Sequence, residues 1–285
     1  MLNRRELALV GITIIWGLTF LLVRNAVSVS GPLFFVGFRF AVATLILLLI
    51  SFKSIPKITK TELIAGSLIG GTLFIGYVLQ TYGLQYISAS KSGFITAFYV
   101  PAVPLVQWLM MRKAPPFFAW IGICFAFIGL ILLAGPDNIS PGFGKGELAT
   151  FIGALVMAWE IVLISFFAGK ISVRRVCIVQ VAVTSVLSFA FIPIVDEPVP
   201  QFSRLLIFSA VLLGAISALV QFVMNWAQKT VSPTRATIIY SGEPIWAGIF
   251  GRLAGERLPV IAVLGGVLVV IGVVVSGLKS AKRDT

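Results

Sequence analysis

The sequence contains no histidine and few charged side chains. Of its 285 residues, 11% are charged and only 10 are acidic, whereas a soluble domain carries about 25% charged residues. The three aspartates, Asp137, Asp196 and Asp284, fall in loops or near the end of the chain, and no DDxxD motif occurs. Metal-dependent chemistry usually needs clustered histidine, cysteine or acidic ligands. We therefore expect no metal, no cofactor and no enzymatic reaction.

Cysteine is also scarce. Cys124 and Cys177 are the only two, and they form no CxxC motif. Both fall within long apolar segments, where a free cysteine usually behaves as a small core residue. We expect both to be core residues, and they do not indicate a redox compartment.

Apolar sequence is abundant. Hydrophobic residues make up 59% of the chain and the mean hydropathy is +1.06. A helix needs roughly 20 apolar residues to cross the hydrocarbon core of a bilayer. The pattern predicts an all-α membrane protein with ten spans, at residues 6–27, 31–51, 62–84, 90–112, 116–134, 146–168, 174–194, 203–228, 233–252 and 259–278. The loops between them leave no room for a soluble catalytic domain.

The formal net charge of +12 is distributed by loop. If both termini lie on one side, the basic residues on that side are Arg4, Arg5, Lys53, Lys57, Lys60, Arg112, Lys113, Lys170, Arg174, Arg175, Lys229, Arg235, Lys279, Lys282 and Arg283. The smaller set on the other side is Arg24, Lys91, Lys145, Arg204, Arg252 and Arg257. Short cytoplasmic loops carry an excess of Lys and Arg. We expect an integral protein of a bacterial inner membrane with both termini cytoplasmic, an organelle membrane being the alternative, and no nucleic-acid partner.

The chain matches itself at an offset of 143 residues without a gap. Trp16 falls on Trp159, Gly71 on Gly214, Gln85 on Gln228, Pro101 on Pro244, Gly122 on Gly265 and Gly129 on Gly272. This predicts two copies of one unit, at residues 1–140 and 141–285, with five spans each. Because five is an odd number, the second copy would be inverted in the bilayer. Many secondary transporters have such inverted repeats and bind substrate between them.

Glycine and proline are placed within the predicted spans. Gly66 and Gly70 form a GxxxG pattern, which lets helix backbones approach closely. Pro101 and Pro104 fall inside the fourth span and Pro244 inside the ninth. An internal proline removes a backbone hydrogen bond and kinks a helix. We interpret these prolines as kinks with a structural or gating role beside a central pathway; the alternative is that they only shape two tilted helices.

Three ionisable residues fall at membrane depth, where charge is costly and usually functional. They are Arg39, Glu160 and Glu243. Two interpretations stay open. Arg39 pairs with Glu160 or Glu243 as a structural ion pair, or the carboxylates bind a substrate ammonium group or carry a proton.

Amide and aromatic side chains follow helical spacing on the third and eighth spans. Amides that face lipid would lack hydrogen-bond partners, so these faces are predicted to turn inward. The substrate-binding candidates are Trp16, Tyr77, Gln80, Tyr82, Tyr99, Trp159, Glu160, Gln221, Asn225, Tyr240 and Glu243. The structural or gating candidates are Arg39, Pro101, Pro104 and Pro244. Gln85, Trp226 and Gln228 are expected to anchor the membrane interface instead.

Several short motifs resemble those of the EamA family in the drug/metabolite transporter superfamily. They are Trp16-Gly17-Leu18-Thr19-Phe20, Arg39-Phe40, the segment from Leu84 to Gly93, Glu243-Pro244 and Gly255-Glu256. The resemblance implies ten helices in two inverted units around a central cavity, and export of amino acids or other metabolites. Trp16, Arg39, Glu243 and Pro244 match motif positions. Gly242 departs from the family, in which a leucine is common before the Glu-Pro pair.

The sequence thus predicts a secondary transporter that exports small metabolites, most simply amino acids and perhaps aromatic ones, by alternating access. An exporter of lipophilic cations is the alternative within the superfamily. A channel is the alternative from another class, although no repeated charged ring is present. The expected partners are a small-molecule substrate and the lipid bilayer. A monomer and a homodimer are equally open.

Overall fold

The structure is a computed structural model that describes residues 2–87, 89–134, 144–253 and 260–277. Within these residues every regular element is helical and none is a strand. The elements in chain order are α1 (Arg4–Val27), α2 (Pro32–Ser51), η1 (Phe52–Lys57), α3 (Lys60–Gly83), α4 (Ala89–Thr96), α5 (Tyr99–Met111), α6 (Phe117–Ala134), α7 (Lys145–Phe167), α8 (Val173–Phe191), η3 (Ile192–Ile194), α9 (Arg204–Ala227), α10 (Pro233–Tyr240), α11 (Glu243–Leu253) and α12 (Val260–Gly277). Each predicted span coincides with one helix or with a pair of helices. Gly255 and Glu256 lie outside the described residues.

Polar side chains and prolines set the starts of the long helices. Asn3 and Glu6 form a capping box on α1, and Thr59 and Glu62 form one on α3. In each box two backbone N–H groups that the helix leaves free find side-chain acceptors. Pro32 begins α2, where a missing N–H has no cost. The capping residues therefore determine where these helices begin.

Seven stretches in the described residues are long and apolar enough to cross a membrane. They are Arg4–Val27, Pro32–Lys57, Lys60–Gly83, Lys91–Met111, Lys145–Phe167, Val173–Ile194 and Arg204–Ala227. Two shorter apolar helices are Phe117–Leu132 and Val263–Ser276. Large apolar side chains cover the outside, for example Leu49 and Ile50 on α2, which are 77% and 73% exposed. Such a surface suits lipid better than water.

Two predicted spans are broken rather than kinked. Residues 97–98 form a turn between α4 and α5, and residues 241–242 form one between α10 and α11. Pro101 and Pro244 lie in the first turn of the helix that follows each break. The prediction that they kink continuous helices was wrong, because proline in a first turn removes no helical hydrogen bond. Pro104 alone of the three is inside a helix, α5.

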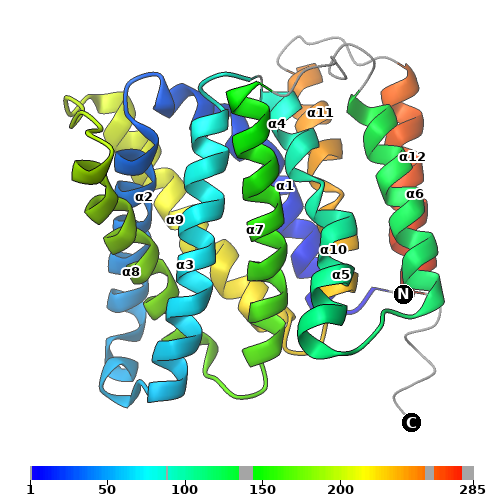
Figure 1. The fold of residues 1–285 in the computed structure, drawn as a ribbon, viewed down its shortest axis with the longest axis horizontal. Helices are drawn as coiled ribbons and strands as arrows, with labels where there is room; N and C mark the ends of the chain where they lie inside the picture. Colours follow the sequence, from blue (N-terminus) through cyan, green and yellow to red (C-terminus); the bar gives the residue numbers. More distant parts are fainter. Residues whose placement is uncertain (1, 88, 135–143, 254–259, 278–285) are drawn as a thin grey trace.

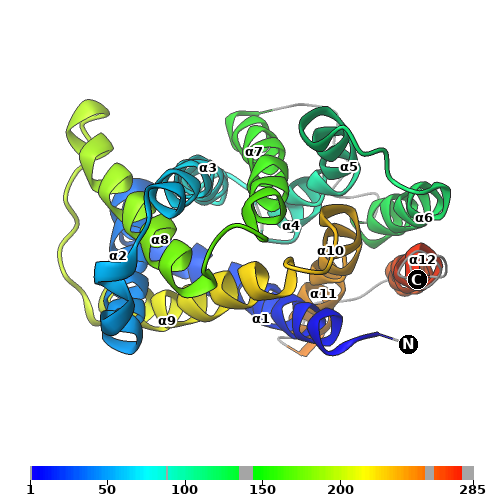
Figure 2. The ribbon, with the colours of Figure 1, turned by 90° about the horizontal axis from the view of Figure 1, so that it is seen from below.

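The helix bounds repeat at the offset of 143 residues. Adding 143 to α6 (Phe117–Ala134) gives the numbers of α12 (Val260–Gly277), and the two breaks fall at equivalent places. Contacts repeat as well: α1 packs on α9 as α7 packs on α3, and α1 on α11 as α7 on α5. The α2/α8 pair lies at one end of the molecule and the α6/α12 pair at the other (Figures 1 and 2).

Glycines make the closest helix crossings. A Cβ on Gly122 would lie 2.7 Å from the Gly272 carbonyl oxygen, and one on Gly129 would lie 2.5 Å from that of Gly265. Because the residue number rises along α6 while it falls along α12, these equivalent helices run antiparallel. The interpretation of glycine as a packing residue also suits Gly70, where a Cβ would lie 2.5 Å from the Gln180 carbonyl oxygen.

The two cysteines differ in environment. Cys177 on α8 is fully buried, in agreement with the prediction. Cys124 on α6 is exposed, so the expectation that it is a core residue was wrong. The reason is that α6 packs chiefly through its glycine face on α12, and Cys124 falls on another side of that helix.

Candidate functional site

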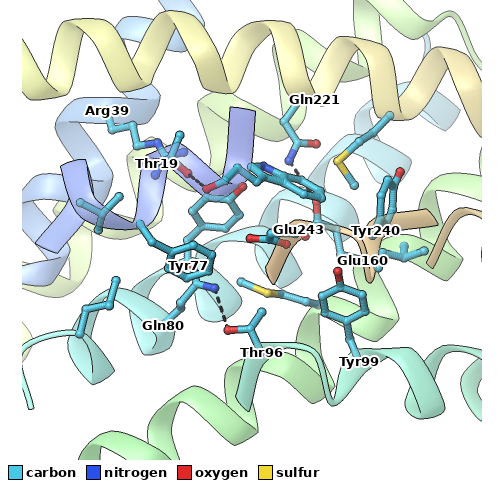
Figure 3. A pocket seen from close by; sticks show the side chains of 17 residues that line it. Thr19, Arg39, Tyr77, Gln80, Thr96, Tyr99, Glu160, Gln221, Tyr240 and Glu243 are labelled. Carbon is cyan, nitrogen blue, oxygen red and sulfur yellow. Dashed lines mark hydrogen bonds between the residues drawn. The ribbon is translucent and has the colours of Figure 1, made fainter. Parts of the chain in front are cut away.

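A polar cavity lies at the centre of the bundle, between side chains from both halves of the chain (Figure 3). Its lining comes from α1, α2, α3, α4, α5, α7, α9, α10 and α11. The predicted site residues that line it are Trp16, Arg39, Tyr77, Gln80, Tyr99, Glu160, Gln221, Tyr240 and Glu243. The free volume between these side chains is about 60 Å³, enough for a few waters. Metabolite sites are usually about 300–1,000 Å³, so the cavity is contracted in this conformation.

Two carboxylates face this cavity from different halves of the bundle. Glu160 on α7 is 3% exposed and Glu243 at the start of α11 is 8% exposed. The Glu160 carboxylate accepts a hydrogen bond of 3.1 Å from the Gln221 side-chain amide. Glu243 lies in the first turn of α11, where the helix dipole favours negative charge. Both carboxylates are therefore placed to meet a cationic group in the cavity.

A chain of amide hydrogen bonds leads to Glu160 from behind the cavity wall. Asn225 donates to the Gln180 oxygen (3.3 Å), and Gln180 donates to the Gln221 oxygen (2.7 Å). Gln221 in turn donates to Glu160. Since a side-chain amide has one acceptor end and one donor end, this order fixes which end of Gln221 faces the carboxylate. We call these three side chains, Asn225, Gln180 and Gln221, the amide relay.

The relay changes the role of one predicted residue and adds another. Asn225 is 2% exposed and does not line the cavity, so its predicted place in the binding surface was wrong. It lies one helical turn after Gln221 on α9, on the side toward α8. Gln180 on α8 is fully buried and was not predicted as a site residue. Its signal was a lone amide in an otherwise apolar helix.

Arg39 does not pair with a glutamate. Its Nε donates to the Ser217 hydroxyl at 2.6 Å, and its guanidinium carbon lies 5.0 Å from the centre of the Tyr77 ring. The ion pairs within the described residues join Lys91 to Glu147, Arg175 to Glu62 and Arg235 to Glu6. The prediction of a structural pair between Arg39 and Glu160 or Glu243 was therefore wrong. Arg39 is held instead by a hydroxyl and by an aromatic face, a favourable place for a cation.

Aromatic rings form much of the rest of the wall. Trp16 meets Tyr240 edge to face with ring centres 5.2 Å apart, and Tyr77 meets Phe40 in the same way at 5.2 Å. The Tyr240 hydroxyl accepts a hydrogen bond of 3.2 Å from Gln228, which itself accepts one from Ser165. Edge-to-face pairs of this kind hold their rings in fixed orientations.

Residues near the span ends need three further corrections. Trp159 is 40% exposed and Tyr82 packs on Tyr86, and neither lines the cavity. Trp159 precedes Glu160, and neighbours in a helix point about 100° apart, so only one of the two faces the centre. Gln228 is buried rather than interfacial, while Gln85 is exposed as expected. Trp226 is partly buried, with Arg5 over its ring.

Several lining residues lacked a strong signal in the sequence. Thr96 accepts a hydrogen bond of 3.0 Å from Gln80, and Thr19 contributes to the wall from α1. Met157 and Met224 also line the cavity. Threonine and methionine are ordinary in apolar helices, and only the packing shows which of them face the centre. Within the described residues, no three histidine, cysteine or acidic side chains come together as a metal site would require.

The chain was compared with known proteins. The model of the EamA-like transporter family matches it twice, at residues 4–135 and 144–278. The chain belongs to the EamA-like transporter family. One crystal structure of another protein superposes with a TM-score of 0.78, covering 98% of this chain and 99% of that one at 16% identity, which shows a shared fold.

Relatives with curated names are transporters. A protein of Archaeoglobus fulgidus named an uncharacterized transporter is 26% identical, over 96% of this chain and 86% of the relative. The uncharacterized inner membrane transporter YedA of Escherichia coli is 29% identical, over 94% and 88%. An S-adenosylmethionine/S-adenosylhomocysteine transporter of Chlamydia muridarum is 24% identical, over 93% and 87%. This EamA-like protein is accordingly an integral membrane transporter of small molecules and not an enzyme.

Proposed function

We propose that this protein is a secondary transporter that exports amino acids, including aromatic ones, by alternating access around the central cavity. The observation that carries the proposal is the composition of that cavity, in which two carboxylates and one arginine are set among aromatic rings. In Figure 3 Arg39 lies on the side of the cavity away from Glu160. A zwitterion with an aromatic side chain has matching chemistry at both ends and along its middle.

Each group of the substrate has a partner in this arrangement. The ammonium group would meet Glu160 and Glu243, and the carboxylate would turn toward Arg39. The side chain would lie against Trp16 and Tyr99. An ammonium beside a buried carboxylate forms a charge-assisted hydrogen bond, which is stronger than a neutral one.

The proposed architecture is ten spans in two inverted repeats, residues 1–140 and 141–285, with both termini in the cytoplasm. The antiparallel course of the equivalent helices α6 and α12 supports the inversion. The double match to the family model supports the division. Rocking the repeats against each other would expose the cavity to each side in turn, as in other transporters with inverted repeats.

The small free volume identifies a closed step in that cycle. The lining residues of α1 run from Trp16 to Val23, toward its C-terminal end. Toward its N-terminal end Leu9 and Ile12 belong to a buried apolar cluster that includes Tyr240. We infer that this cluster closes the cytoplasmic side, and that the other side must open before substrate is released.

A second candidate is an exporter of organic cations. It is favoured by the excess of carboxylates over arginine in the cavity and by the S-adenosylmethionine transporter among the relatives, whose named substrate is a cation. Cation–π contact with Trp16, Tyr99 or Tyr240 would contribute to such binding.

Counterflow in proteoliposomes tests both candidates. Vesicles loaded with unlabelled aromatic amino acids should take up labelled phenylalanine or tryptophan with saturable kinetics, with or without a proton gradient. Uptake of S-adenosylmethionine and of a quaternary ammonium is measured in parallel. Saturable uptake of the cations alone would select the second candidate. Flux of any of them that rises linearly with concentration would contradict both and indicate a channel.

Glu160→Gln and Glu243→Gln then separate binding from coupling. If a carboxylate binds the ammonium group, its glutamine variant should raise KM at least about tenfold, the effect of 1.4 kcal/mol. If it carries a coupling proton, exchange should persist while uphill transport driven by a proton gradient is lost. Glu197→Gln, in the loop after α8, is the control and should leave both measurements unchanged.

A further inference from the structure

A second hollow opens on the outside of the bundle, beside the central cavity but separate from it. It lies between α1, the α10–α11 break and α12, and its volume is about 670 Å³. Thr13 and Ile239 on its floor are 1% and 2% exposed, whereas Val270 and Val274 at its mouth are 55% and 57% exposed. We call it the lateral groove. Its volume lies within the range of ligand sites.

The groove is apolar along its length and charged at one end. Val10 on α1, Ile245 and Trp246 on α11, and Val269 on α12 form its walls. Arg235, near the start of α10, stands at the end where α1 begins. A groove with an apolar body and a cationic end has the chemistry of an amphiphile site.

Arg235 is held in place but not fully used. Its Nε donates to Glu6 at 2.8 Å, and one terminal nitrogen, Nη1, donates to the Ser276 hydroxyl and to the Val273 carbonyl. Within the described residues no hydrogen bond engages the other, Nη2. A guanidinium has five N–H donors in a fixed fork. The free edge of this fork can therefore donate to an oxyanion without releasing its protein partners.

More positive charge surrounds this end of the groove. Arg4 and Lys229 are exposed there, and Arg5 donates to Thr230 at 2.7 Å, which joins the start of α1 to the end of α9. Glu6 offsets part of this charge through its ion pair with Arg235. The surroundings as a whole complement an anion. Basic pockets between membrane helices on the cytoplasmic side bind anionic lipid headgroups.

The length of the groove matches one leaflet of a bilayer. Its lining on α1 ends at Thr13, nine residues after the first helical residue Arg4. That is a rise of about 14 Å, close to half of a hydrocarbon core of about 30 Å. An acyl chain with its headgroup beside Arg235 would end near the middle of the membrane.

We propose that the lateral groove binds one anionic phospholipid, with an acyl chain against Trp246 and the headgroup phosphate on Arg235. The lipid would contact the α10–α11 break from outside, while Glu243, after that break, faces the central cavity. A bound lipid would thus stabilise one position of a broken span that the transport cycle moves. The proposal requires that the chain spans a membrane but not that it carries any particular substrate.

Quenching of Trp246 fluorescence by brominated lipids tests the proposal directly. The wild type and Trp246→Phe are reconstituted in phosphatidylcholine vesicles with a small mole fraction of brominated phosphatidylglycerol or of brominated phosphatidylcholine. The difference between the two proteins isolates Trp246. We expect brominated phosphatidylglycerol to quench it about fivefold more effectively at equal mole fraction, given the attraction of a basic residue for an anionic lipid.

Two charge variants predict opposite changes. Arg235→Gln should remove the preference, so that both lipids quench equally. Glu6→Gln keeps a side chain that can cap α1 but frees Arg235, and it should increase the preference. If Glu6→Gln instead abolishes the preference as Arg235→Gln does, the ion pair supports the fold and the proposed headgroup contact is overturned.

A matched pair of valines tests the apolar part. Val270 and Val267 both lie on α12 with similar exposure, 55% and 52%, but only Val270 lines the groove. Val270→Phe should reduce the quenching of Trp246 by brominated phosphatidylglycerol, and Val267→Phe should not. Equal quenching by both lipids in the wild type would overturn the anionic preference. A Trp246 that neither lipid quenches would show that protein covers the groove and would overturn the site.

Discussion

The central cavity depends on single side chains whose orientation is set by neighbours that never touch it. Gln180 illustrates this: it lies behind the wall, yet its hydrogen bond to Gln221 decides which end of that amide meets Glu160. A buried amide can rotate by half a turn, and only its partners determine the result. Sequence patterns that select cavity-facing residues therefore miss residues of this kind.

Replacing Gln180 with leucine should weaken substrate binding without touching the substrate. The Gln221 oxygen would lose its donor and Gln221 would rotate away from Glu160, at a cost of about 1–3 kcal/mol for an unsatisfied buried group. We expect KM in counterflow to rise about tenfold with little change in maximal rate. Gln85→Leu, on the exposed end of α3, is the control. Equal effects from both variants would contradict the positioning role of the relay.

Neighbouring glycines on α3 offer a test of packing. A Cβ on Gly70 would lie 2.5 Å from the Gln180 carbonyl oxygen, whereas one on Gly71 would meet nothing within 4 Å. Gly70→Ala should therefore lower the free energy of unfolding by about 1–3 kcal/mol, as overpacking does. Gly71→Ala should be neutral or slightly stabilising, because alanine favours helix. Thermal melting in detergent measures both, and a lower melting temperature for Gly71→Ala would argue against this packing.

At the scale of elements, the two broken spans are tied at their starts by ion pairs. Lys91 in α4 meets Glu147 in α7 at 2.7 Å, and Arg235 in α10 meets Glu6 in α1 at 2.8 Å. Since α4 corresponds to α10 and α7 to α1 at the offset of 143 residues, the two pairs occupy equivalent places in the repeats. Each joins a broken span to an unbroken one, so each is placed to hold one end of the bundle closed.

Breaking the Lys91–Glu147 pair should favour opening at that end. A cysteine at Phe20, which lines the cavity, reports access in a background with Cys124→Ser. We expect Glu147→Gln to increase its labelling by an impermeant maleimide up to about fivefold, the effect of a partly exposed pair worth up to about 1 kcal/mol. The exchanged double variant Lys91→Glu with Glu147→Lys should restore slow labelling. Labelling that stays fast in the exchanged variant would mean that the contact is not an ion-pair closure.

At the scale of the whole molecule, the inverted arrangement places equivalent loops on opposite sides of the membrane. Residues 52–57, after α2, include Lys53 and Lys57, whereas residues 192–203, after α8, include Asp196 and Glu197 and no basic residue. A bias of this kind orients the chain with basic loops inside. The antiparallel packing of α6 on α12 requires the same opposition.

Cysteine labelling in intact cells tests the orientation. Ile55→Cys should react with an impermeant reagent only after the cells are opened, and Val199→Cys should react from outside. Both side chains are exposed, at 38% and 68%, so burial does not decide the result. Reaction of both from the same side would contradict the inverted repeat, and reversed sides would contradict only the cytoplasmic placement of the termini.

The sequence alone determined the helices, the repeat and most of the cavity wall. Apolar stretches of about 20 residues and their capping residues depend on local chemistry, and the offset of 143 residues is a property of the letters themselves. Arg39, Glu160 and Glu243 stood out because charge within an apolar span needs a reason. Trp16, Tyr77, Tyr99, Gln80, Gln221 and Tyr240 followed from spacing and resemblance.

Only the tertiary structure decided how these residues meet. It placed Arg39 on Ser217 rather than on a glutamate, turned Trp159 outward, and put Asn225 and Gln180 behind Gln221. It also broke two spans that hydropathy shows as continuous, and it opened the lateral groove beside one break. Partners of this kind come from helices more than 40 residues apart in the chain, so their contacts depend on how the helices pack and not on the local sequence.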